Sequence, residues 1–162
     1  MRDMTLEASP IAAERSRLAG FVGVWTGQGQ RLASPWGAGG ETVGTWTARL
    51  DPMALHLLVD YEETLSTGGR LCGHGVMMVD PGDLKVLWFW FDSFGFPPLA
   101  PARGAWTSSR LIVDKQTPRG AGRTSWTLDG QRLVQAVSFK SPQDEDFLMV
   151  STMTMRRSAD PD

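Results

Sequence analysis

The feature that most constrains the fold is the pattern that follows Gly20. From there the chain is a succession of short runs rich in β-branched and aromatic residues, and residues typical of turns separate each run from the next. Such runs predict β-strands. We expect about ten of them, over the ranges 21–31, 42–50, 54–65, 70–79, 85–92, 103–107, 110–116, 121–128, 132–140 and 146–156. Asp129-Gly130, between two apolar runs, is the clearest hairpin signal.

The short connections indicate how these strands are arranged. A meander of about ten strands either keeps two open edges or closes on itself, and closure removes the edges. We therefore predict an all-β protein, an antiparallel up-and-down barrel. A two-sheet sandwich is the alternative, but it usually has fewer strands and longer crossing connections. Glycines inside the predicted strands favour a curved barrel, because they mark bends or the close approach of a large side chain; they are Gly27, Gly29, Gly44, Gly73 and Gly75.

The N-terminal part has a different pattern. Residues 11–19 favour a short helix, with Ser9 as its N-cap, Pro10 at its first position and Gly20 at its stop. The length of 162 residues indicates one domain. We expect a leader and helix over 1–17, the barrel over 18–157 and a tail over 158–162.

Composition excludes several functions. The net charge of −2 argues against general binding of nucleic acid or of an anionic membrane. No apolar run has the length of a signal peptide or of a membrane span, so we expect a cytoplasmic protein. One cysteine and two histidines leave no disulfide and little room for a metal site. We find no serine-nucleophile, phosphate-loop or paired-histidine motif.

Seven tryptophans are the main functional signal. A barrel of about ten strands is wider than one that side chains just fill, so an internal cavity is expected. Rigid aromatic faces in such a cavity bind flat, apolar ligands well. We predict that some of the tryptophans contact a small apolar or aromatic molecule, namely Trp25, Trp88, Trp90 and Trp106. The alternative is that all of them only fill the core.

Three polar residues are candidates for fixing the polar end of such a ligand. They are Tyr61, His74 and Arg103. An even loop over 66–69 places His74 on the face that carries Tyr61 and Glu63. Glu62 and Glu63 are adjacent and point to opposite faces of a strand, so only one of them reaches the interior, where it meets a basic group.

Two segments indicate contacts at the surface. Residues 85–92 are apolar on both faces, and the face outside the barrel needs a cover. Trp88 and Trp90 share one face, and the sequence leaves open which face is inside. The apolar, proline-rich stretch 92–101 has the composition of a lid over the barrel mouth or of a subunit contact. A homodimer is therefore expected.

The run from Leu18 to Gly29, with Trp25 in it, resembles the first strand of calycin barrels such as lipocalins, fatty-acid-binding proteins and nitrobindins. Taken in order, further stretches resemble the bacterial family catalogued as domain of unknown function 1579. They are Ser34-Pro-Trp36, Gly39-Gly40, Tyr61-Glu-Glu63, Gly73-His-Gly75, Trp90-Phe-Asp-Ser93, Gly95-Phe-Pro97, Ala102-Arg-Gly104, Thr117-Pro-Arg-Gly120 and Met155-Arg-Arg157.

The resemblance implies a lipocalin-like barrel with an interior pocket and no established reaction. Nitrobindins hold heme through a histidine near the C-terminus, and the last predicted strand here, 146–156, has none. We expect no cofactor. Three hypotheses follow. The first is a binding protein for a small apolar molecule. The second is a cyclase, isomerase or hydrolase that uses His74 with Glu62 or Glu63. The third is a filled structural module that dimerises.

Overall fold

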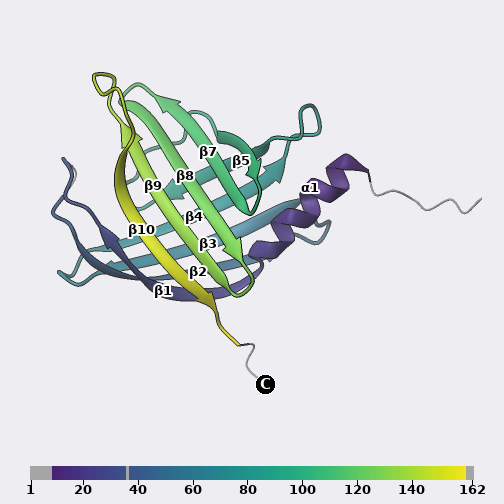
Figure 1. The fold of residues 1–162 in the computed structure, drawn as a ribbon, viewed down its shortest axis with the longest axis horizontal. Helices are drawn as coiled ribbons and strands as arrows, with labels where there is room; N and C mark the ends of the chain where they lie inside the picture. The colour runs from purple at the N-terminus through teal and green to yellow at the C-terminus, as the bar shows by residue number, and fades with distance from the viewer. Residues whose placement is uncertain (1–8, 36, 160–162) are drawn as a thin grey trace, which may run out of the picture.

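The computed structural model describes residues 9–35 and 37–159. Within these ranges the chain forms one closed barrel of ten antiparallel strands with a short helix at its start (Figure 1). The helix is α1 (Pro10–Leu18), and the strands are β1 (Gly23–Arg31), β2 (Gly40–Leu50), β3 (His56–Leu65), β4 (Arg70–Val79), β5 (Val86–Asp92), β6 (Ala102–Thr107), β7 (Arg110–Thr117), β8 (Gly120–Asp129), β9 (Arg132–Lys140) and β10 (Leu148–Arg157). None of the described helices is long and apolar enough to span a membrane.

The barrel is the predicted up-and-down meander. Every strand pairs with its neighbours in sequence, and β1 pairs with β10 to close the sheet. All ten predicted strands are confirmed, with small differences at their ends. The predicted hairpin at Asp129-Gly130 connects β8 to β9, and Asp129 pairs with Arg132. Residues 1–8 of the predicted leader, Trp36 and residues 160–162 of the predicted tail lie outside the described residues.

Helix α1 begins as its sequence predicts, with the Ser9 hydroxyl accepting a hydrogen bond from the backbone N–H of Ala12. It ends earlier than predicted, at Leu18, and continues as a 3-10 turn over Ala19–Phe21. Gly20 therefore lies within this turn instead of stopping the α-helix. The turn directs Leu18 and Phe21 toward the barrel axis, where both are buried.

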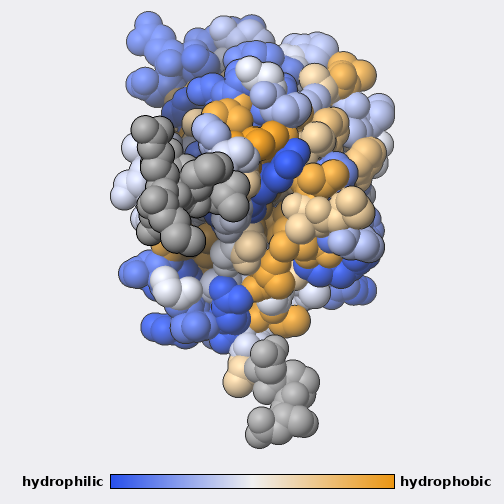
Figure 2. Space-filling view, turned by 90° about the vertical axis from the view of Figure 1, so that its right-hand side faces the viewer, coloured by the Kyte–Doolittle hydropathy of each residue, from blue (hydrophilic) through white to orange (hydrophobic). Residues whose placement is uncertain are grey.

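These side chains fill the end of the barrel at which β1 begins, here named the closed end. Phe21 contacts the rings of Trp46, Trp106 and Trp126, at centroid distances of 5.9, 5.6 and 6.3 Å. Arg157 holds the turn by donating hydrogen bonds to the carbonyls of Val22 and Gly20. Seen from the side on which α1 lies, hydrophobic side chains form a broken band between hydrophilic ones (Figure 2).

Two of the strand glycines receive tryptophan rings. A Cβ on Gly73 would lie 2.1 Å from the Trp90 ring, and one on Gly75 would lie 1.9 Å from the Trp88 ring. The two indoles therefore lie directly against the backbone of β4, which only glycine permits. This confirms close approach of large side chains as the reason for these glycines.

The opposite end of the barrel, where β1 ends at Arg31 and β5 ends at Asp92, is here named the open end. Strands β5 and β6 pair only over Val86–Trp88 and 102–104. Beyond Trp88 strand β5 stays paired with β4 up to Asp92, and the chain then passes through the loop 93–101 and returns at Ala102. Within the described residues, 89–92 of β5 therefore have no ladder partner on β6.

Candidate functional site

A cavity occupies the open end of the barrel. Its outer part, of about 300 Å³, lies under the loop 93–101 and the β7–β8 turn. Its inner part, of about 280 Å³, extends down the barrel axis to Trp88 and Trp126. Arg31, Trp90 and Lys115 line both parts, so the two form one continuous space. Together they have the size of a small-molecule site.

One wall of the cavity is aromatic. Trp88 and Trp90 on β5 stack with their ring centroids 5.2 Å apart and their planes at 24°, and Tyr61 lies 6.2 Å from Trp90. The indole N–H of Trp90 donates a hydrogen bond of 2.9 Å to Asp92 Oδ2. The glycines behind the rings and this hydrogen bond hold Trp90 in a fixed orientation, with its ring along the cavity.

The floor of the cavity is polar. Tyr61 donates a hydrogen bond of 2.8 Å from its hydroxyl to Glu63 Oε2, and Arg31 donates one of 3.1 Å to Glu63 Oε1. Gln135 accepts a hydrogen bond of 2.8 Å from the indole of Trp126, and its amide partly offsets the rise that burial causes in the pKa of Tyr61. A row of polar side chains from β1, β3 and β9 therefore crosses the barrel.

Within this row the pKa of Tyr61 is raised above its ordinary value. Burial is the largest cause, followed by the negative charge of Glu63 and the hydrogen bond to that carboxylate. The phenol stays protonated and remains a donor to Glu63. Glu63 is itself buried, and its charge is compensated by Arg31. The prediction that one of the two glutamates meets a basic group inside the barrel is confirmed.

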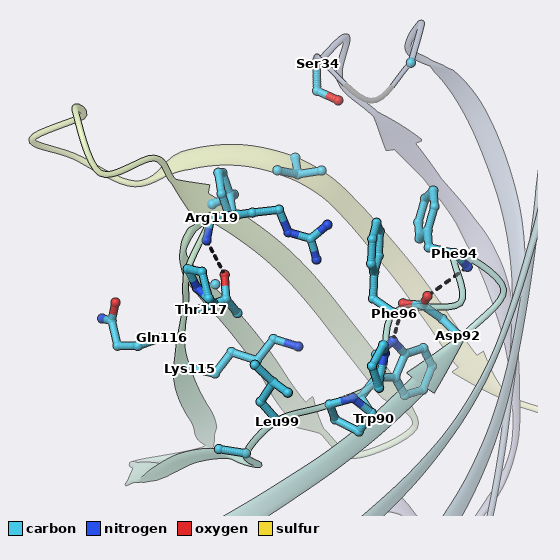
Figure 3. A pocket seen from close by; sticks show the side chains of 18 of the residues that line it. Ser34, Trp90, Asp92, Phe94, Phe96, Leu99, Lys115, Gln116, Thr117 and Arg119 are labelled. Carbon is cyan, nitrogen blue, oxygen red and sulfur yellow. Dashed lines mark hydrogen bonds between the residues drawn. The ribbon is translucent and has the colours of Figure 1, made fainter.

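Two cations line the cavity near its mouth. Lys115 projects inward from β7, and Arg119 follows from the β7–β8 turn. The Arg119 guanidinium lies over the ring of Phe96, 3.6 Å from the ring centroid. Figure 3 shows both side chains extending from one wall toward Trp90, Asp92 and Phe96 on the other.

The loop 93–101 forms the rim. The backbone N–H of Phe94 donates a hydrogen bond of 3.0 Å to Asp92 Oδ1, so the carboxylate that orients Trp90 also anchors the start of the loop. Phe94, Phe96 and Leu99 line the cavity and still expose 53, 55 and 81% of their surface. The loop lies at the mouth, as a lid would, and its opening or its contact with a second subunit stays a prediction.

The structure brings three of the seven predicted ligand-binding residues together and separates the other four from them. Tyr61, Trp88 and Trp90 all line the inner cavity. Trp25 is completely buried at the closed end, where its indole donates a hydrogen bond to the carbonyl of Phe21. Trp106 stacks on Phe21 at the same end. Neither of these two tryptophans borders the cavity. Both pack in the core, as the alternative interpretation of the tryptophans expects.

His74 lies on the outer face of the barrel, so its predicted position inside is wrong. Its side chain is 75% exposed, and its Nδ1 is within hydrogen-bond distance of Asp60 on the neighbouring strand. From there it cannot reach a ligand in the cavity. The space beside Gly73 and Gly75 is instead filled by the tryptophan rings described above.

The error arose in the β3–β4 turn. An even loop over 66–69 would pair Tyr61 with His74, but Thr64 pairs with Arg70, so five residues form the connection. Gly68, with a φ of 101°, supplies the left-handed conformation that this longer turn requires. A shift of one residue in register moves a side chain to the other face of the sheet.

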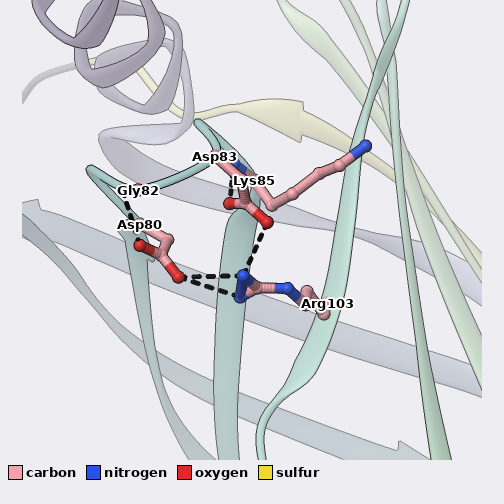
Figure 4. A network of polar contacts seen from close by, with 5 residues as sticks. All are labelled: Asp80, Gly82, Asp83, Lys85 and Arg103. Atoms are coloured by element: carbon pink, nitrogen blue, oxygen red, sulfur yellow. Dashed lines mark hydrogen bonds and ion pairs between the residues drawn. The ribbon is translucent and has the colours of Figure 1, made fainter.

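Arg103 also lies outside the barrel, contrary to its predicted role. It donates hydrogen bonds of 2.9 Å to Asp80 and 2.6 Å to Asp83 in the β4–β5 connection (Figure 4). Its neighbour Gly104 occupies the inward position on β6 instead. Its guanidinium is thus occupied by two of the protein's own aspartates.

The register of β3 and β4 also separates His74 from Glu63, one of the two glutamates that the enzymatic hypothesis pairs with it. Glu62 is outside and pairs with Arg70, Glu63 is inside, and His74 is on the outer wall. Neither glutamate contacts the histidine within the described residues. These described residues also contain no group of three or more potential metal ligands.

Sequence reasoning missed several residues that shape the site. Arg31, Lys115 and Gln135 line the cavity but were not singled out. Alternation along β7 is the signal that could have found Lys115, because it continues the inward positions of Leu111 and Val113, both buried. No comparable signal identifies the Gln135–Tyr61 contact, which joins strands distant in the chain.

Comparisons with known proteins support the fold. The crystal structure of Rv2717c from M. tuberculosis is similar with a TM-score of 0.68 at 12% identity, over 94% of this chain and 100% of that one. The S-type phycobiliprotein lyase CPES from Guillardia theta is similar with a TM-score of 0.65 at 10% identity, over 95% of this chain and 100% of that one. No family model matches the chain. No curated protein matches it either. The chain therefore shares the fold of these two structures.

Proposed function

We propose that this protein binds a flat, mostly apolar small molecule in the cavity at the open end of its barrel. The observation that carries the proposal is a cavity walled by stacked indoles in a barrel whose other end is packed with buried aromatic side chains. Ten strands leave more interior space than side chains need, and the cavity at the open end is part of that space. A ligand of this class would lie against Trp90, between the aromatic wall and the polar floor.

The orientation of Trp90 also supports binding of a ligand in the cavity. Trp90 is partly exposed, lines both parts of the cavity and is held in place by its hydrogen bond to Asp92. Preorganised aromatic faces lower the entropy lost on binding, which favours affinity. The proposal rests on this geometry, since the likeness to solved structures concerns the fold.

The finer assignments from the sequence are also proposals. Kinship with the family catalogued as domain of unknown function 1579 rests on the ordered motifs alone. The homodimer and the cytoplasmic location stay predictions, and ligand binding in the cavity requires neither.

Titration with N-phenyl-1-naphthylamine, an uncharged aromatic fluorophore, tests the proposal. We expect a saturable rise in probe fluorescence with one site per chain, and matching quenching of tryptophan fluorescence. The substitution Trp90→Leu should weaken binding by roughly tenfold or more, because it removes the main aromatic face.

Phe91→Leu is the matched control. Phe91 is the next residue on β5, points to the outer face and is 52% exposed, so its truncation should leave binding unchanged. Equal loss of binding in both variants would contradict a site inside the barrel. Absence of any saturable signal with the unmodified protein would contradict the proposed function itself.

A further inference from the structure

We propose that the ligand carries an anionic group, and that Lys115 and Arg119 bind this group near the mouth of the cavity. The inference rests on the proposed function and goes further, because it names the chemical class of the ligand. That class is an aromatic or otherwise apolar acid, with its hydrophobic body inside the barrel and its carboxylate, or a comparable anion, near the rim.

The two acidic groups of the cavity already accept hydrogen bonds on both of their carboxylate oxygens. Glu63 accepts hydrogen bonds from Tyr61 and Arg31, one on each carboxylate oxygen. Asp92 also uses both oxygens, accepting from the Trp90 indole and from the backbone of Phe94. These carboxylates hold parts of the protein in place. Neither needs a cationic ligand to complete its bonding.

The charged groups of Lys115 and Arg119, near the mouth, differ from these carboxylates in their bonding. Within residues 9–35 and 37–159, the ammonium group of Lys115 has no ion pair and no hydrogen bond. In the same ranges, Arg119 has a hydrogen bond only through its backbone N–H, to Thr117, while its guanidinium rests on Phe96. By contrast Arg31, which shares the cavity, pairs with Glu63. The positive charge left unmatched inside the site is that of Lys115 and Arg119.

Lys115 is placed on an inward position although it carries a charge. It follows Val113 in the alternation of β7, and it is half-buried. Directly opposite on β8 is Gly122, where an added Cβ would only make ordinary contact with the lysine stem, at 3.8 Å. The stem therefore has free space to move along the wall. A half-buried cation without a partner is unfavourable, and an anionic ligand would compensate it.

Arg119, in the β7–β8 turn, places a second positive charge beside the outer part of the cavity that Lys115 also lines. Its guanidinium is fixed over Phe96, which leaves the N–H groups around its edge free to donate to an anion. Figure 3 shows it directed into the same space as Lys115. A ligand stacked on Trp90 would thus present its outer end between two cations on the opposite wall.

The experiment compares two ligands that differ essentially in charge. Naphthalene-2-carboxylate and naphthalene-2-carboxamide have the same flat body and nearly the same shape. Each is titrated against the complex of the protein with N-phenyl-1-naphthylamine, and its affinity is read from displacement of the probe. We expect the carboxylate to bind about tenfold more tightly, which is the effect of a charge-assisted hydrogen bond, and we expect this preference to weaken in high salt.

Variants assign the preference to residues. Lys115→Met keeps about the length of the stem and removes the charge. Arg119→Gln removes the charge at the rim and keeps a shorter polar side chain. Each should reduce the preference for the carboxylate by roughly threefold or more, with the double variant binding the two ligands equally. Lys85→Met is the control, since Lys85 is exposed on the β4–β5 connection and extends away from its neighbours there (Figure 4).

The outcomes separate this inference from the proposed function. If the neutral probe binds but the carboxylate and carboxamide displace it equally, or the double variant keeps the full preference, the anionic class is wrong and the binding function stands. If the preference is lost equally in Lys85→Met, the effect is one of net charge and the site assignment is wrong. If the neutral probe does not bind the unmodified protein, the proposed function fails and this inference fails with it.

Discussion

The two ends of this barrel are built from the same strands and have opposite interiors. At the closed end the buried ring of Phe21 contacts Trp46, Trp106 and Trp126, and Trp46 contacts Trp126. At the open end Trp90 and Tyr61 border an unfilled space of about 280 Å³. Trp88 and Trp126 lie between the two regions, since they contact the buried aromatic cluster and also line the inner end of the cavity.

The difference comes from what covers each end. A 3-10 turn inserts Phe21 into the closed end, and Arg157 fixes that turn to the last strand. Within residues 9–35 and 37–159 no corresponding segment enters the open end, where the loop 93–101 lies at the rim instead. Packing thus supplies stability at one end and leaves the other available for binding.

The largest effect should come from removing the plug. Phe21→Ala deletes a completely buried ring at the centre of the aromatic cluster and should lower the free energy of unfolding by about 3–5 kcal/mol. Phe96→Ala, the same change on a half-exposed ring at the open end, should cost less than about 1 kcal/mol. Urea denaturation measures both. Equal losses would mean that the two ends do not differ in packing.

A smaller effect should come from filling space behind the rings. Gly75→Ala places a Cβ within 1.9 Å of the Trp88 ring, which is held by its neighbours, so we expect a loss of about 1–3 kcal/mol. Gly122→Ala also adds an inward methyl group, but at the open end, where its nearest contact is 3.8 Å away. That variant should unfold at the same urea concentration as the unmodified protein. A loss in Gly122→Ala as large as in Gly75→Ala would show that the open end has no spare space.

Tyr61, which lies between the two ends, should make the free energy of unfolding depend on pH above about pH 10. Burial keeps Tyr61 protonated in the folded state, whereas in the unfolded state it ionises near pH 10.0. The stabilising contribution is therefore complete below that pH and decreases above it, by about 1.4 kcal/mol per pH unit. The decrease should be absent in Tyr61→Phe, so the difference in unfolding free energy between the two proteins should narrow as pH rises from about 9 to about 11.

Tyr61 is the single tyrosine of the chain, so the absorbance of tyrosinate reports on it alone. In the folded protein that absorbance should not appear near pH 10.0, and it should appear there after denaturation in urea. Ionisation of Tyr61 near pH 10.0 in the folded protein would contradict its burial in the polar floor of the cavity.

The smallest effect is expected outside the barrel. His74→Gln changes an exposed side chain paired with Asp60, so the free energy of unfolding should change by less than about 0.5 kcal/mol. Affinity for N-phenyl-1-naphthylamine should also be unchanged, in contrast to Trp90→Leu. A large loss of affinity in His74→Gln would require the histidine to act on the cavity through the wall.

Much of the fold could be predicted because its signals are local. Turn residues and short β-branched runs mark each strand, and the closed barrel follows from the need to remove sheet edges. The site could be predicted only in part. Tyr61, Trp88 and Trp90 were identified and lie together, whereas His74 and Arg103 were placed on the wrong face. Each of these two errors concerns which side of a strand faces inward.

By itself, the sequence determined the number of strands, their order and the helix at the start, because hydrophobic alternation and turn chemistry act over a few neighbouring residues. The tertiary structure alone decided which residues line the cavity. The count of the β3–β4 turn set the face of His74, and the insertion of Phe21 filled one end of the barrel. Lys115 and Arg119 line one cavity with Trp90 because closure of the sheet places their strands on opposite sides of the same interior.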